Sequence, residues 1–207
     1  MQILAGPLMA AVRREKIRER AEAFEQKHGR APGLAVVLVG DDPASQVYVS
    51  SKLKTCQELG FESFEHRLSG ATTAHQLRSI IESLNDNSLV DGILLQLPLP
   101  GHLHAEEAIS WISPEKDADC LTSQNLGRLW SGRALTKPCT PSGVMAILEH
   151  YDIDPAGMNA VVVGRSGIVG KPMAHLLVEA NATVTVCHSR TRDLRAHTLH
   201  ADLVVVA

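Results

Sequence analysis

The sequence predicts an α/β protein with an N-terminal α/β domain and a second, Rossmann-like domain. Continuous apolar runs at residues 34–40, 91–100 and 159–163 are typical of strands that are covered on both faces. Helical patterns separate these runs and the turns between them are short, as in α/β folds. The chain has 207 residues, of which 44% are hydrophobic and 21% are charged, so it is long enough to bury one or two cores.

The composition argues against several classes of partner. The net charge of -3 and a pI near 6.4 give no general attraction to nucleic acid or to an anionic membrane. No apolar run approaches the roughly 18 residues of a membrane span, and residues 1–9 lack the pattern of a secretory signal. A cytoplasmic protein is therefore expected. The four cysteines form no Cys-x-x-Cys pair, which favours reduced structural thiols over a zinc site or a disulfide framework; they are Cys56, Cys120, Cys139 and Cys187.

The N-terminal domain is expected to alternate helices and strands, with several ends marked by local signals. Asp42 is the predicted N-cap of a helix over residues 43–59, and Gly60 its C-terminal stop. Thr73 and Gln76 form a predicted capping box. The other expected elements are helices over residues 10–28, from 73 and over 105–112, and strands over 34–40, 63–68 and 91–100, the last of which must stop at its prolines.

Two side chains of the second helix carry the first chemical signal. Tyr48 and Lys52 are four residues apart, so they project side by side near the carboxyl end of a buried strand, where α/β proteins usually bind ligands. A partly desolvated lysine can shuttle protons, because burial lowers its pKa. A half-buried tyrosine beside a solvated lysine is the alternative. Gln96 ends another buried strand.

The second half of the chain predicts a nucleotide-binding unit, with a domain border near residues 138–143 and domains over residues 1–140 and 141–207. Thr140 is the predicted cap of a helix that runs to residue 150. Strands over 159–163, 183–187 and 202–206 alternate with helices over 169–179 and 191–199. The turn after the first of these strands contains Gly164, Gly167 and Gly170. Its backbone amides can approach a phosphate at the start of the helix, although a plain strand-to-helix turn is the alternative.

The end of the next strand bears on which dinucleotide is bound. A NAD site requires an acid there for the ribose hydroxyls, whereas this strand is followed by His188, Ser189 and Arg190. A hydroxyl and a guanidinium suit a 2′-phosphate, and Arg165 of the glycine turn is available to help. NADP is therefore favoured over NAD, with a solvated surface arginine as the alternative for Arg190.

Six segments of the chain are specific when taken together. They are Tyr48-x-x-x-Lys52-x-Lys54, Asp91-Gly92 through Gln96-Leu97-Pro98-Leu99-Pro100, Lys116-Asp117-Ala118-Asp119, Pro138-Cys139-Thr140-Pro141, Gly164-Arg165-Ser166 through Gly170-Lys171-Pro172, and Cys187-His188-Ser189. In this order they resemble the bifunctional methylenetetrahydrofolate dehydrogenase/methenyltetrahydrofolate cyclohydrolase family, of the FolD type. The resemblance covers nearly all of the chain.

The resemblance implies a role for several residues. It makes Lys52 the catalytic lysine, places Tyr48 and Gln96 in the folate pocket, and assigns Asp119 to the pterin ring. A carboxylate can accept two parallel hydrogen bonds from the 2-amino group and a ring N-H; without the resemblance, Asp119 is equally well an acidic surface residue. Tyr48 either stacks on the pterin or hydrogen-bonds Lys52. The resemblance further implies NADP as cofactor, tetrahydrofolate one-carbon derivatives as substrates, a part in one-carbon metabolism and purine biosynthesis, and a homodimer.

The chain departs from the family pattern in two places. Family members usually have glycine after the second aspartate of the Lys-Asp-x-Asp loop, where this chain has Cys120, so the loop is in question if that position needs a positive φ. Family members also continue beyond the point that corresponds to Ala207, so the nucleotide-binding fold is expected to be incomplete here. A fragment, a truncated product or an incomplete sequence are the three explanations.

The chemistry assigns Lys52 mainly to hydrolysis. Removal of a hydride from methylenetetrahydrofolate leaves a cation without loss of a proton, so it needs positioning of the two reactants and little else. Hydrolysis of the methenyl cation moves protons at water and at a ring nitrogen, and an amine oriented by neutral Gln96 can serve both. The alternatives to a bifunctional enzyme are a dehydrogenase without cyclohydrolase activity and a noncatalytic folate-binding or dimerising form. No set of side chains has the spacing of a metal site, and His175 is expected to be a packing or surface residue.

Overall fold

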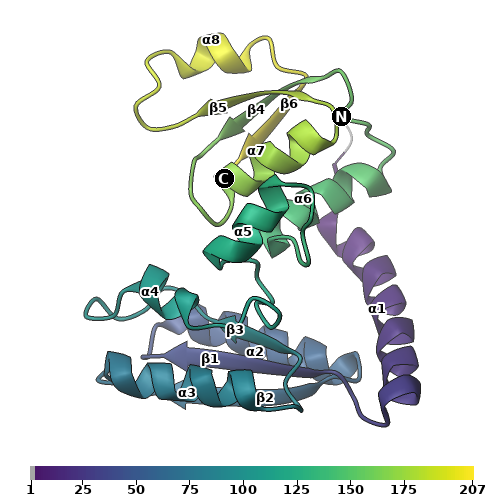
Figure 1. Cartoon of the computed structure of the whole chain (residues 1–207). Coiled ribbons are helices and arrows are strands. Elements are labelled where there is room, and N and C mark those ends of the chain that lie inside the picture. The colour runs from purple at the N-terminus through teal and green to yellow at the C-terminus, as the bar shows by residue number, and fades with distance from the viewer. Residues whose placement is uncertain (1–2) are drawn as a thin grey trace. The chain divides into compact units, whose positions relative to one another are not determined.

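The computed structural model describes residues 3–207, which fall into two compact units (Figure 1). The first unit comprises residues 11–136, and the second comprises residues 137–207 together with the residues up to Ala10. The elements in chain order are α1 (Gly6–His28), β1 (Gly33–Val39), α2 (Pro43–Glu58), β2 (Glu62–Leu68), α3 (Ala74–Asp86), β3 (Gly92–Leu95), α4 (Ala105–Ser110), α5 (Ser123–Trp130), α6 (Cys139–His150), β4 (Asn159–Val163), α7 (Gly170–Glu179), β5 (Thr183–Cys187), α8 (Leu194–Thr198) and β6 (Leu203–Val206).

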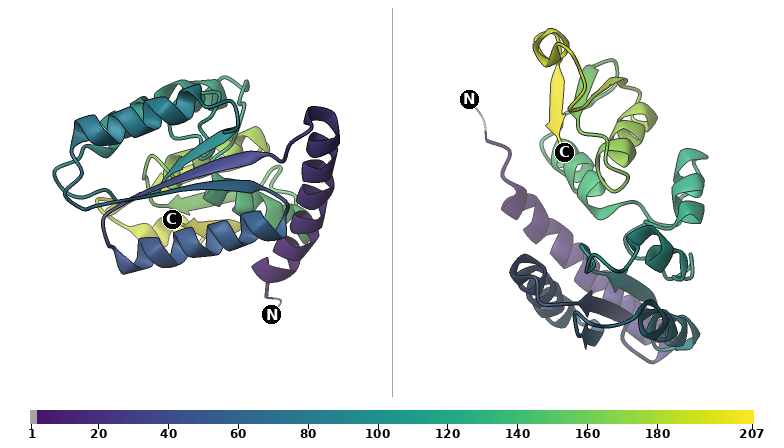
Figure 2. Two further views of the ribbon diagram at one scale, coloured as in Figure 1. Left: turned by 90° about the horizontal axis from the view of Figure 1, so that it is seen from below. Right: turned by 90° about the vertical axis from the view of Figure 1, so that its left-hand side faces the viewer.

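The first unit is built on a parallel sheet of order β2-β1-β3. Successive side chains of a strand point to opposite faces. Ala35, Val37 and Val39 of β1 therefore pack with α3 and α4 in one cluster, while Val36 and Leu38 pack with α2 in another. Helices α2 and α3 consequently lie on opposite faces of the sheet (Figure 2). The predicted double-sided burial of the apolar run at residues 34–40 is confirmed.

Local capping signals account for the ends of α2 and α3. The Asp42 side chain accepts a hydrogen bond of 2.7 Å from the Ser45 amide, and Pro43 opens the helix without requiring a donor. Gly60 follows the helix with φ 78°, the left-handed conformation of a C-terminal glycine. Thr73 and Gln76 form both bonds of a capping box. The predictions for Asp42, for Gly60 and for the capping box are confirmed.

The second unit has a parallel sheet of order β5-β4-β6, covered on one face by α7, which also packs on α6. Ala160, Val161 and Val162 of β4 are buried, as are most side chains of α7. The predicted α/β class, with parallel sheets, is confirmed in both units. The carboxyl ends of β4 and β5 are aligned, because Val163 pairs with Cys187 and the Gly164 amide donates to the Cys187 carbonyl at 2.8 Å.

Several predicted boundaries are wrong. Helix α6 begins at Cys139 after Pro138, so Thr140 lies within its first turn and is not its cap. Helix α8 covers only Leu194–Thr198, because Asp193 caps it by accepting from the Ala196 amide at 3.0 Å. Helix α1 begins at Gly6 rather than at residue 10, and strand β3 ends at Leu95, before the prolines.

Helix α5 was not predicted at all. Its sequence, SQNLGRLW, contains a glycine and is only eight residues long, which weakens its helical pattern. Thr122 caps it by accepting from the Asn125 amide at 3.3 Å. The capping threonine was the available signal.

Candidate active site

Lys52 and Gln96 meet at the carboxyl edge of the first sheet. Lys52 lies on α2, and Gln96 directly follows β3. The Lys52 Nζ donates to Gln96 Oε1 at 3.2 Å, and Gln96 Nε2 donates to the Leu97 carbonyl at 2.7 Å. Gln96 is thus held by its own backbone with its amide oxygen toward the lysine. Both side chains are half-buried, which leaves the ammonium partly accessible to a substrate.

Tyr48 precedes Lys52 by one helical turn, but its side chain is 65% exposed. Within residues 3–207, no hydrogen bond joins the Tyr48 hydroxyl to Lys52. Tyr48 was expected either to hydrogen-bond Lys52 or to stack on the pterin, and the structure does not show the hydrogen bond. The exposed phenol ring on this face can lie against a flat ligand.

The segment that carries Asp119 runs beside β3. Residues Ile93 and Asp117 form a parallel bridge, in which the Ile93 amide donates to the Lys116 carbonyl at 2.6 Å and the Ala118 amide to the Ile93 carbonyl at 3.3 Å. Because the two segments run in the same direction, Asp119 follows toward the carboxyl end of β3. This is the edge at which Gln96 lies. Asp119 is half-buried in the structure.

Asp117 is the buried anchor of this loop, a role that its sequence motif alone does not indicate. The residue is only 2% exposed, and its carboxylate accepts four hydrogen bonds. The donors are the Leu121 amide at 3.0 Å, the Thr122 amide and hydroxyl at 2.8 Å each, and Asn125 Nδ2 at 3.0 Å. A carboxylate that accepts several hydrogen bonds holds the groups that donate to it firmly in place. Asp117 thereby closes the turn that contains Asp119 and fixes the start of α5.

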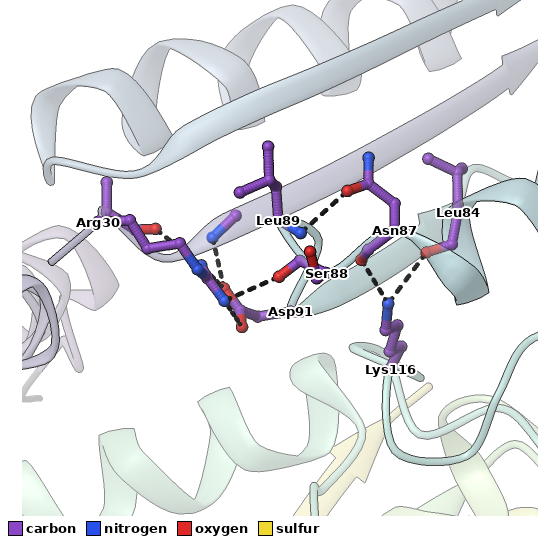
Figure 3. Close-up of polar contacts among 9 residues, drawn as sticks. Arg30, Leu84, Asn87, Ser88, Leu89, Asp91 and Lys116 are labelled. Atoms are coloured by element: carbon purple, nitrogen blue, oxygen red, sulfur yellow. Dashed lines mark hydrogen bonds and ion pairs between the residues drawn. The ribbon is translucent and has the colours of Figure 1, made fainter. Parts of the chain in front are cut away.

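Lys116, the first residue of the Lys116-Asp117-Ala118-Asp119 segment, caps a helix. Its Nζ donates to the carbonyls of Leu84 at 3.1 Å and Asn87 at 2.7 Å, at the C-terminal end of α3 (Figure 3). A cation is stabilising there because the last carbonyls of a helix lack intrahelical partners. Lys116 therefore joins the loop to the opposite end of the sheet from Lys52.

Arg30 and Asp91 form an ion pair beside the Lys116 contact (Figure 3). Arg30 donates to both carboxylate oxygens of Asp91, at 2.7 and 2.8 Å, and Asp91 also accepts from the Gly33 amide at 2.8 Å. The hydrogen bond from Arg30 holds the pKa of Asp91 below its ordinary value. Asp91, which belongs to one of the six sequence segments, thus ties the start of β3 to the start of β1.

Cys120 adopts the positive φ that glycine would supply at this position. Its φ is 57°, in the left-handed region, and the residue is fully buried. Burial raises the pKa of its thiol, which is the opposite of what a reactive cysteine requires. The loop therefore keeps its turn despite the absence of glycine, and Cys120 serves as a packing residue.

The glycine turn of the second unit has two positions that only glycine fits. A Cβ on Gly170 would lie 2.4 Å from the Gly164 carbonyl oxygen and 2.8 Å from the Arg165 amide nitrogen. Gly164 has φ 137°, and a Cβ there would lie 2.4 Å from the Ala207 carbonyl oxygen. Gly170 allows the turn to fold tightly onto the start of α7, and Gly164 allows the chain to pass close to the residue that follows β6.

Ser166 folds the turn back onto the first residues of α7, although the N-cap position itself is Val169. Its Oγ accepts from the amides of Val169 and Gly170, each at 3.2 Å. Among the residues that the structure describes, none accepts a hydrogen bond from the Gly167 or Ile168 amide, and a Cβ on Gly167 would meet open space. Two exposed donors therefore remain at the tip of the turn, as a phosphate-binding turn requires.

Ser189 and Arg190 are exposed in the turn that follows β5, and Arg165 is exposed after β4. Since β4 and β5 are adjacent and in register, these residues lie beyond neighbouring strand ends. His175, in contrast, is buried in α7 with Nε2 3.4 Å from Glu179 Oε1, and is a packing residue as expected. Within residues 3–207 no group of His, Cys, Asp and Glu side chains is arranged to hold a metal.

One parallel sheet has a lysine and an amide at its carboxyl edge, and the other has a glycine turn of the phosphate-binding type. These features are typical of two-domain α/β enzymes that use a dinucleotide. The model of the tetrahydrofolate dehydrogenase/cyclohydrolase catalytic domain matches residues 4–119, and the model of the NAD(P)-binding domain of the same family matches residues 138–207. The chain belongs to the tetrahydrofolate dehydrogenase/cyclohydrolase family, as its sequence resemblance predicted.

Individual relatives agree with the family models. The chain is 52% identical over 205 residues to the bifunctional protein FolD of Bdellovibrio bacteriovorus, a match that covers 99% of this chain and 71% of the relative. It superposes on the bifunctional FolD structure of Campylobacter jejuni with a TM-score of 0.96 at 44% identity, which covers 100% of this chain and 73% of the other. It also resembles the Trypanosoma brucei methylenetetrahydrofolate dehydrogenase-cyclohydrolase, whose structure was determined with NADP and an inhibitor (TM-score 0.93, 36% identity, 100% and 71% covered).

Proposed function

We propose that this protein oxidises 5,10-methylenetetrahydrofolate to 5,10-methenyltetrahydrofolate with NADP and then hydrolyses the product to 10-formyltetrahydrofolate. The hydrogen bond between Lys52 Nζ and Gln96 Oε1 carries this proposal. It provides a proton-transferring amine beside a neutral amide, which hydride transfer alone does not need. Family membership and the bifunctional names of the relatives support the same pair of activities.

The oxidation step requires mainly that the substrate be held in place. NADP, when bound, accepts the hydride from the one-carbon bridge. No proton leaves the substrate in this step, so the protein's contribution is to orient the two reactants and exclude water. Asp119 would hold the pterin by accepting from its 2-amino group and a ring N-H, and Tyr48 would lie against the ring face.

The hydrolysis step gives Lys52 a chemical task. Water must lose a proton as it adds to the methenyl carbon, and a ring nitrogen must gain one as the tetrahedral adduct opens. An amine can perform both transfers because it is a base when neutral and an acid when protonated. Gln96 would keep the Nζ directed at the reacting carbon, and its neutrality avoids a competing charge near the cationic substrate.

Six residues are proposed to bind NADP, in the second unit. The tight turn made possible by Gly164 and Gly170 would present the backbone to the diphosphate, with Ser166 in the turn that leads into α7. The cationic and hydroxyl side chains for the 2′-phosphate are Arg165, Ser189 and Arg190. The two exposed amides at the tip of the turn support the fit of this group to the chain.

The remaining assignments concern context. We assign residues 1–140 to the folate-binding catalytic domain and residues 141–207 to the N-terminal part of the NADP-binding domain. A cytoplasmic homodimer with a part in purine biosynthesis, and with no nucleic-acid or membrane partner, is the proposed setting. Within the described residues no helix has the length and apolar character needed to cross a bilayer.

Two assays on the purified protein test the proposal. The first adds NADP and methylenetetrahydrofolate and follows NADPH and methenyl product by absorbance, with NAD in place of NADP as the comparison. The second adds methenyltetrahydrofolate alone and follows its loss above the uncatalysed rate. Both activities are expected, with NADP preferred. Oxidation without hydrolysis would reduce the protein to a dehydrogenase, and the absence of both would refute the proposal.

A further inference from the structure

A closed four-residue turn, His188 to Thr191, follows strand β5. The Thr191 amide donates to the His188 carbonyl at 2.8 Å, which closes the backbone as a β-turn. Two side chains form further hydrogen bonds within the turn. The Thr191 Oγ1 accepts from the His188 amide at 2.9 Å, and the His188 Nδ1 accepts from the Arg190 amide at 3.1 Å.

These bonds divide the turn into a frame and an exposed tip. His188 and Thr191 are half-buried and direct their acceptors into the turn, while Ser189 and Arg190 at its centre are exposed. The frame is attached to the sheet, because Cys187 is buried and its carbonyl accepts from the Gly164 amide at 2.8 Å. The tip therefore occupies a defined place beside the glycine turn.

We propose that His188 and Thr191 are positioning residues that determine the preference of this enzyme for a 2′-phosphorylated dinucleotide. They touch no ligand themselves; they hold Ser189 and Arg190 so that a hydroxyl and a guanidinium face the same phosphate. The inference rests on the proposed NADP-dependent function, and it adds two residues that position Ser189 and Arg190.

The physical basis is the entropy of ordering a loop. A mobile tip would lose backbone and side-chain freedom when the phosphate binds, and that loss would weaken binding. The two side-chain bonds restrict the tip before the ligand arrives. The rest of the dinucleotide is expected to contact the glycine turn. Loosening the turn from His188 to Thr191 should therefore weaken recognition of the 2′-phosphate selectively.

Paired substitutions separate the missing acceptor from a general change of shape. Thr191→Val replaces the hydroxyl by a methyl group of similar size, whereas Thr191→Ser retains the acceptor. His188→Leu removes the ring nitrogen, whereas His188→Asn supplies an amide oxygen in a comparable position. Thr185→Val, at an exposed position of β5, is the matched control for a threonine-to-valine change away from the turn.

Binding of two probes by isothermal titration calorimetry gives a readout that does not depend on activity. The probes are 2′,5′-ADP, which has the 2′-phosphate, and 5′-AMP, which lacks it. We expect Thr191→Val and His188→Leu each to weaken 2′,5′-ADP binding by about five- to tenfold, the effect of one lost hydrogen bond. Binding of 5′-AMP should remain within about twofold, and Thr191→Ser, His188→Asn and Thr185→Val should bind both probes like the wild type.

Three results would overturn the inference. Equal weakening of both probes in Thr191→Val and His188→Leu would show a general structural role rather than positioning for the phosphate. Unchanged binding of 2′,5′-ADP in both variants would show that the frame is not needed. A wild-type protein that binds the two probes equally would refute the NADP preference itself, and the inference would fall with it.

Discussion

Asp117 offers the sharpest test of how the loop of Asp119 is held. The substitution Asp117→Asn keeps the shape of the side chain but leaves one acceptor oxygen in place of two. In the structure one oxygen, Oδ2, accepts three of the four bonds, from Thr122 and Asn125, and Oδ1 accepts the bond from the Leu121 amide. If the asparagine oxygen takes the three-bond position, its NH2 group faces the Leu121 amide, donor against donor.

The magnitude follows from these contacts. One buried bond becomes a mismatch of donors, which costs about 1–3 kcal/mol, and three bonds lose the assistance of a charge. The total is about 2–4 kcal/mol of unfolding free energy, or a fall in Tm of roughly 5–15 °C for a domain of this size. Thermal unfolding followed by circular dichroism measures it. Asp86→Asn, an exposed change at the C-terminal end of α3, is the control and should shift Tm little.

Asp117 is not the anchor of the loop if both Asp117→Asn and Asp86→Asn unfold within about 2 °C of the wild type. That result would mean that water or a rearranged loop replaces the four bonds without loss. A large loss of Tm in both variants would point to a nonspecific effect of removing negative charge.

Three other predictions concern single positions. Gly170→Ala should lower the urea midpoint and abolish binding of 2′,5′-ADP, because its Cβ would lie 2.4 Å from the Gly164 carbonyl oxygen; normal binding in a titration would contradict the tight turn. Cys120→Gly should be about 1 kcal/mol more stable to urea than Cys120→Ala, since φ is 57° there, and the reverse order would argue against a left-handed residue. The pKa of Asp91 is lowered by Arg30, so the pair's stabilisation is complete above the ordinary aspartate pKa of about 3.9 and is lost as the pH falls through the lower folded pKa. Asp91→Asn should therefore flatten the acid limb of a stability profile from urea unfolding, and an unchanged limb would count against it.

Features set by neighbouring residues were predictable from the sequence. The caps of α2 and α3 depend on contacts three residues apart, and the double-sided burial of β1 depends on an unbroken apolar run. The approach of Lys52 to Gln96 was also accessible, although 44 residues separate them, because both follow or border the carboxyl ends of adjacent parallel strands.

Features set by distant partners were not predictable. Lys116 caps α3 from about 30 residues away, and Asp117 anchors an eight-residue helix whose own pattern is weak. No periodicity encodes such contacts, since each depends on where the fold brings a backbone carbonyl or amide. Ser166 differs, because its hydroxyl accepts from amides three and four residues further along the chain, so this contact is local in sequence.

The assignment of Lys52 to proton transfer is tested by comparing Lys52→Met with Lys54→Met in the two half-reactions. Lys54 lies on the same helix but is exposed, with its Nζ 3.9 Å from Glu58, so it controls for removal of a lysine from α2. Rates of methenyl hydrolysis and of NADP-dependent oxidation would be measured separately for each variant. We expect Lys52→Met to lose hydrolysis by at least about a hundredfold while keeping measurable oxidation, and Lys54→Met to keep both. Equal loss of both activities in Lys52→Met, or hydrolysis that survives it, would contradict the assignment of Lys52 to proton transfer.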